Sequence, residues 1–68
     1  MKQIECRFTG TPIPRGVVLS CGVVYFNHSA DWVQYMGDFP DSLEAAKYME
    51  DAVRHCISVE FRITEQSL

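Results

Sequence analysis

The stretch DSLEAAKYMEDAVRH, residues 41–55, has the clearest pattern in the chain and decides the fold. Asp41 is placed to cap a helix, and Glu44, three residues later, completes a pattern like a capping box. The small and apolar side chains that share one stripe of a helical wheel are Ala45, Ala46, Met49, Ala52, Val53 and Cys56, with Leu43 at the edge of the stripe. The sequence therefore predicts an amphipathic helix over about 42–55, whose apolar stripe packs against the rest of the domain.

Alternating segments lie on both sides of this helix. Residues 4–8 place Ile4, Cys6 and Phe8 at every second position, with charged residues between them. Residues 57–63 repeat the pattern after the helix, again with apolar side chains at every second position. A period of two is typical of a strand that buries one face, so the sequence predicts a strand at each place.

The segment between the first strand and the helix predicts a hairpin. Residues 9–16 contain two prolines and two glycines and predict a loop. Residues 17–26 are rich in β-branched and aromatic side chains and predict one strand, and residues 32–36 predict its returning partner after a turn over 27–31.

The expected order is therefore β-β-β-α-β. We expect one α+β domain over residues 1–68, since a chain of 68 residues has room for one small domain. Its three- to four-stranded, mostly antiparallel sheet would carry the single helix packed on one face.

The predicted hairpin poses a problem, because both of its faces are apolar. A single helix covers one face of a sheet, and the outer strands have a polar second face, which carries Glu5, Arg7, Glu60 and Arg62. Three explanations of the apolar second face of the hairpin stay open: the 9–16 loop or the C-terminal tail covers it, two copies pair through it, or a different protein docks on it. The aromatic and methionine anchors for a docked partner would be Trp32, Tyr35, Met36 and Phe39.

The charge distribution excludes one class of partner and favours another. The net charge is −3, the pI is about 5.1, and the six basic residues are scattered, which argues against direct binding to nucleic acid. The acidic residues gather at the start of the helix and on its solvent face: Asp38, Asp41, Glu44 and Asp51, joined by Glu50. They either complement the helix dipole or form an acidic ridge that occupies a basic surface on a protein partner.

The residues that could carry chemistry do not form a site. Cys6, Cys21 and Cys56 lack the close pairing that structural zinc sites use, so we expect no metal and no cofactor. His28, Ser29 and Asp31 are the residue types of a hydrolytic triad, but one short turn cannot bury and orient them. We therefore expect that the protein is not an enzyme.

The sequence also predicts the compartment. An odd number of cysteines is unusual for a secreted domain of this size. The first residues turn polar at once, and no apolar run approaches the roughly 20 residues that span a bilayer. We expect a reduced, cytoplasmic protein that does not bind membranes.

Phe39 and the segment DSLEAA, residues 41–46, carry a resemblance to known small proteins. A hairpin, this helix start and one alternating strand are similar to short phage-encoded inhibitors of bacterial machinery, including inhibitors of RNA polymerase and of CRISPR surveillance complexes. The layout also resembles the degenerate RNase H-like antitoxins of bacterial toxin–antitoxin pairs. The shared residues encode a helix start, and the resemblance assigns no functional residue.

Small size, acidity and a doubly apolar hairpin lead to one expectation of function. We expect a non-enzymatic binding protein that occludes a partner's surface, most concretely a phage or mobile-element inhibitor of a bacterial complex that handles nucleic acid. The alternative is a homodimeric bacterial accessory or structural protein, or an antitoxin-like partner of a toxin.

Overall fold

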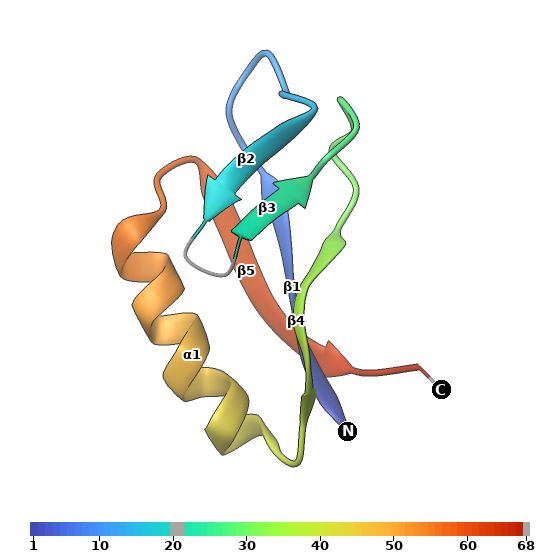
Figure 1. The fold of residues 1–68 in the computed structure, drawn as a ribbon, viewed down its shortest axis with the longest axis vertical. Helices are drawn as coiled ribbons and strands as arrows, with labels where there is room; N and C mark the ends of the chain where they lie inside the picture. The colour runs from blue at the N-terminus through green and yellow to red at the C-terminus, as the bar shows by residue number, and fades with distance from the viewer. Residues whose placement is uncertain (20–21, 68) are drawn as a thin grey trace.

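The computed structural model describes residues 1–19 and 22–67, and it shows two small antiparallel sheets and one helix (Figure 1). The main sheet has the strand order β4-β1-β5, and a second sheet pairs β2 with β3. The elements along the chain are β1 (Lys2–Phe8), β2 (Gly16–Leu19), β3 (Gly22–Tyr25), β4 (Val33–Phe39), α1 (Ser42–His55) and β5 (Val59–Glu65). The α+β class predicted from the sequence is confirmed.

The first strand of the chain is the centre of the main sheet. β1 pairs antiparallel with β5 without interruption, and with β4 through a register that shifts on either side of Ile4. Ile4 and Cys6 are completely buried on the covered face. Above them the rings of Tyr35 and Phe61 meet edge to face at 5.4 Å, so the two outer strands touch across the central one.

Helix α1 has the bounds and the cap that the sequence predicts. The Asp41 backbone is extended, and its Oδ1 accepts a hydrogen bond of 2.9 Å from the Glu44 amide. Ala45 and Ala52 are buried, and their small side chains let the helix lie close to the sheet. The predicted apolar stripe is too wide, because Leu43 is 70% exposed and Val53 is also exposed. Both flank the narrow line of contact through the two alanines.

The prediction of one strand over 17–26 is wrong. The segment is a hairpin in which β2 and β3 pair with each other, with Leu19 opposite Gly22. Gly22, the first residue of β3, has φ +130°, a conformation that residues with a side chain rarely adopt. Ser20 and Cys21, which belonged to the predicted strand, lie outside the described residues.

The prediction that 32–36 pairs with 17–26 is also wrong. β4 pairs with β1 and extends to Phe39, beyond the predicted end. Asn27 and His28 both have positive φ, so the chain leaves β3 in a left-handed turn. It then reaches the open edge of β1 instead of returning along β3.

The last strand starts later than the sequence predicts. β5 begins at Val59, because Ser58 has φ +62° and interrupts the extended backbone. Ile57, predicted to point into the core with Val59 and Phe61, is 91% exposed. Its side chain stands at the corner between α1 and β5.

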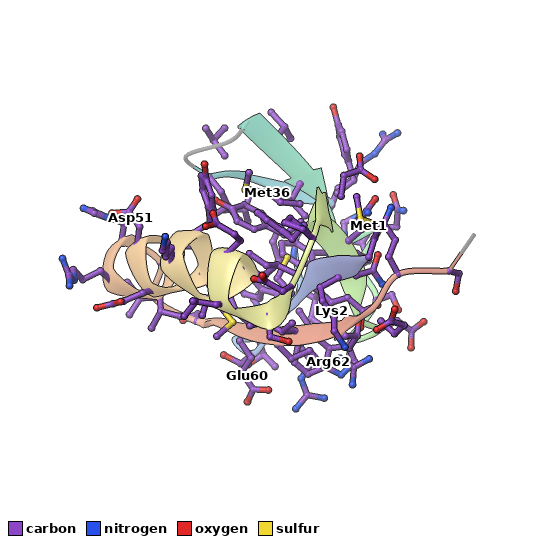
Figure 2. All side chains as sticks on the ribbon, turned by 90° about the horizontal axis from the view of Figure 1, so that it is seen from below. Met1, Lys2, Met36, Asp51, Glu60 and Arg62 are labelled. Carbon is purple, nitrogen blue, oxygen red and sulfur yellow. The ribbon has the colours of Figure 1, made fainter. Side chains whose placement is uncertain are left out.

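The hairpin covers the main sheet on the same side as the helix. Its inner face buries Leu19, Val24 and, just beyond β3, Phe26, whose ring lies 5.8 Å from that of Phe8. Figure 2 shows the hairpin on one side of the main sheet and the labelled Glu60 and Arg62 on the other. The chain thus hides the inner face of its own hairpin.

The outer face of the hairpin stays exposed at Val18, Val23 and Tyr25. No helix among the described residues is both long and apolar enough to cross a membrane.

Candidate partner-binding surfaces

Charged side chains cover the face of the main sheet that lies opposite the helix. Arg7 pairs with Glu60 at 3.0 Å, and Arg62 pairs with Glu5 at 2.8 Å. Both guanidinium groups also lie over the ring of Trp32, at 5.0 and 4.1 Å from its centroid. The predicted polar face is confirmed. Trp32, a predicted partner anchor, is half-buried beneath two arginines that belong to its own chain.

The other predicted anchors lie mainly in the core. Tyr35 and Phe39 are buried, and Met36 is half-buried against the core. Phe39 also contacts Tyr48 of α1, with 5.4 Å between ring centroids. A direct contact of these anchors with a partner stays a prediction, and the structure brings them together as packing residues rather than as an exposed patch.

Two of the predicted acidic residues support the local backbone at the start of the helix. Asp38 has φ +65°, and its amide donates to Gln66 Oε1 at 2.6 Å. The side-chain nitrogen Nε2 of Gln66 in turn donates to Asp38 Oδ1 at 3.0 Å. Asp41 caps the helix. Both carboxylates therefore have a structural role that is independent of any partner.

The other two acidic residues, Glu44 and Asp51, share the solvent side of α1. With Lys47 and Tyr48 they line a shallow depression of about 480 Å³. Leu43 lies four positions before Lys47, at the start of the same side. Tyr48 is 52% exposed and Leu43 is more so, and we call these five residues the α1 outer face.

The sequence interpretation missed the apolar part of this face. It assigned Leu43 to the edge of the buried stripe and did not consider Tyr48. The spacing contains the missing signal, because Tyr48 lies four residues after Glu44 and three before Asp51, which places all three on one side of a helix.

Ion pairs neutralise the glutamates but not the aspartates. Among the described residues, every Lys and Arg except Arg15 has a glutamate partner. Lys2 donates to Glu65 at 2.7 Å, and this bond, the Lys2 charge and the N-terminal ammonium lower the pKa of the Glu65 carboxyl. The net charge of −3 therefore resides on the four aspartates and Arg15.

An apolar groove lies where β2 approaches the end of the helix. It has a volume of about 430 Å³ and is lined by Val17, Val18, Leu19, His55, Cys56, Ile57 and Val59. Val18 and Ile57 are its most exposed members, at 76% and 91%. The sequence interpretation missed this groove, because it placed Ile57 in the core and read β2 and β3 as a single strand.

The remaining candidate residues take part in turns and packing. In the part of the chain that the structure describes, no three His, Cys, Asp or Glu side chains lie close enough to hold a metal ion. The His28 ring nitrogen Nδ1 lies 3.0 Å from the Ile13 carbonyl, and Ser29 Oγ accepts from the Asp31 amide at 3.1 Å. These contacts fix the turn after β3 and do not align a nucleophile with a base.

No family model matches this chain, and no curated protein or solved structure is significantly similar to it. Its function has to be inferred from the chemistry of the surfaces described above.

Proposed function

We propose that this protein is a non-enzymatic binding module that occludes a basic surface of a protein partner with the α1 outer face. The observation that carries the proposal is the exposure of Tyr48 and Leu43 beside the carboxylates of Glu44 and Asp51. Tyr48 packs against Phe39, with 5.4 Å between the ring centroids, but it remains 52% exposed, and Leu43 is not among the side chains packed against the core. On a partner, however, an exposed tyrosine is a common energetic centre of an interface.

The helix supports this face rigidly. Asp41 caps its first turn, and Ala45 and Ala52 fix the opposite side against the sheet. The side chains of the outer face thus project from backbone that is already ordered, which lowers the entropic cost of binding.

The charge of the face selects the partner. Lys47 pairs with Glu44 at 3.1 Å, whereas the ion-pair partner of Asp51 among the described residues is His55, at 3.7 Å. A negative potential accelerates the approach of a basic surface and repels acidic ones. Basic surfaces are typical of proteins that handle nucleic acid.

The most concrete partner is therefore a bacterial complex of that kind, such as RNA polymerase or a CRISPR surveillance complex. Blocking such a surface requires a complementary shape and charge and no catalytic group.

Affinity capture from bacterial lysate with matched charge reversals tests the proposal. Asp51→Lys lies on the outer face, while Glu50→Lys reverses a neighbouring exposed carboxylate that pairs with Arg54 at 3.2 Å. We expect a specific partner to be lost with Asp51→Lys and with Tyr48→Ala, and retained with Glu50→Lys. Capture that also weakens with added salt supports the charge argument. A partner that binds the Asp51→Lys and Tyr48→Ala proteins as well as wild type would refute it.

A further inference from the structure

One edge of the hairpin is built to accept another strand. β2 has β3 as its neighbour on one side, and no described strand pairs with its other side. The Phe26 amide donates to the Arg15 carbonyl at 2.6 Å, which fixes the alternation of hydrogen-bonded pairs along the hairpin. Val17–Val24 is then a hydrogen-bonded pair, and Gly16–Tyr25 and Val18–Val23 are not. The amides and carbonyls of Gly16 and Val18 therefore point away from β3.

This edge faces the apolar groove at the end of α1. The groove is lined by all three valine and leucine residues of β2 and by none of β3, so it lies along the open side of β2. The only titratable side chains on its walls are His55 and the thiol of Cys56, and no carboxylate lines it. Exposed main-chain groups beside exposed apolar side chains are the two features that strand addition requires.

From these features we infer that two copies of this chain form a symmetric dimer by antiparallel pairing of their β2 edges. The pairing is centred on Val17 and sets Gly16 of one copy opposite Val18 of the other. The outward amide and carbonyl groups of Gly16 and Val18 then hydrogen-bond with each other across the interface, once on each side of the two-fold axis. Ile57 and Val18 of each copy then lie beside the second copy and leave solvent. The four strands β3-β2-β2-β3 form one continuous sheet.

Charge favours a second copy as the occupant of this edge. Two molecules with a net charge of −3 repel least where neither carries a carboxylate, and the residues of β2 are all uncharged. The pairing also puts Arg15 opposite Leu19 of the second copy, at the end of β2. Among the described residues Arg15 is the basic side chain without a glutamate partner, so at this edge it offsets part of the repulsion between the two negatively charged copies.

Sedimentation over roughly 10 μM to 1 mM, a range in which small interfaces associate, measures the dimer directly. We expect the apparent mass to rise from that of one chain to that of two. Val18→Pro removes an amide hydrogen that only the dimer uses, and we expect it to weaken association by about tenfold or more. Val23→Pro is the matched control, because it removes the equivalent amide from the other edge of the same hairpin. We expect it to dimerise like wild type.

Amide hydrogen exchange provides a second readout that needs no substitution. We expect the Gly16 and Val18 amides to become protected as the concentration rises, while those of Val23 and Tyr25 do not. Arg15→Glu, which leaves the α1 outer face intact, should weaken the dimer and leave partner capture by that face unchanged.

Three results would overturn the inference. They are a wild-type protein that stays monomeric to the highest concentration, a dimer that Val23→Pro weakens as much as Val18→Pro, and concentration-dependent protection on β3 instead of β2. If either proline variant fails to fold, judged by its helix signal, the exchange pattern of the wild type decides alone. The dimer uses a different surface from the proposed function, so either can fail without the other.

Discussion

Phe26 is the side chain that attaches the hairpin to the main sheet, and its removal should be the most damaging single truncation in that part of the molecule. It is 1% exposed and is the largest fully buried side chain in the described chain. Truncating a buried phenylalanine to alanine costs about 3–5 kcal/mol. A domain of 68 residues has a free energy of unfolding of roughly 3–10 kcal/mol. Phe26→Ala should therefore remove between about a third of the stability and all of it, and Phe26→Leu, which leaves a smaller cavity, about 1–2 kcal/mol.

Urea unfolding monitored by helix circular dichroism and by the fluorescence of Trp32 provides the assay. Tyr25→Ala is the matched control, because the adjacent aromatic side chain lies on the exposed outer face of the same hairpin. We expect it to change the free energy of unfolding by less than about 0.5 kcal/mol. A Phe26→Ala protein within about 1 kcal/mol of wild type, or a Tyr25→Ala protein destabilised to the same extent, would show that the hairpin is not attached in this way.

Three further perturbations test other parts of the structure. Asp41→Ala should lower the free energy of unfolding by about 1 kcal/mol in urea titrations, whereas Asp41→Ser should restore most of it, because serine also accepts from the helix amides. The contact with Lys2 lowers the pKa of Glu65 in the folded state. The contact therefore stabilises the protein fully at pH values above the ordinary glutamate pKa, and this stabilisation is lost as the pH falls through the lowered pKa. The acid-induced loss of stability should therefore be smaller in Glu65→Gln, and an identical pH profile would contradict this. Arg62→Ala should expose the Trp32 ring to iodide quenching. A double-mutant cycle between Arg62 and Trp32 should give a coupling free energy of about 0.5–2 kcal/mol, and a coupling near zero would exclude the stacking.

The parts of the fold that follow from local pattern were predictable. The capping position of Asp41 and the period of the following residues set the bounds of α1, and the alternation around Ile4 and Cys6 identified β1. These signals depend on a few neighbouring residues. The polar face of Glu5, Arg7 and their partners followed from the same alternation.

Pairing between distant segments was not predictable from those patterns. Residues 17–26 are apolar throughout, so their composition hides the reversal that the positive φ of Gly22 marks. The choice of β1 rather than the hairpin as the partner of β4 depends on where the turn at Asn27 and His28 directs the chain. The same difficulty applies to the candidate surfaces, since the groove joins β2 to the end of α1 across more than thirty residues of sequence.

The central position of β1 in the main sheet has a kinetic consequence. Its two neighbours come from far along the chain, and a side-chain contact such as Gln3 with Thr64 spans 61 residues. Loops of this size must close before the central strand gains any partner, and such non-local pairing slows folding. The backbone hydrogen bonds within α1 and within the β2–β3 hairpin join residues that are close in sequence, so these two elements can form much faster. We therefore expect the rate-limiting step of folding to be the arrival of β1 between β4 and β5, and folding in milliseconds to seconds rather than microseconds.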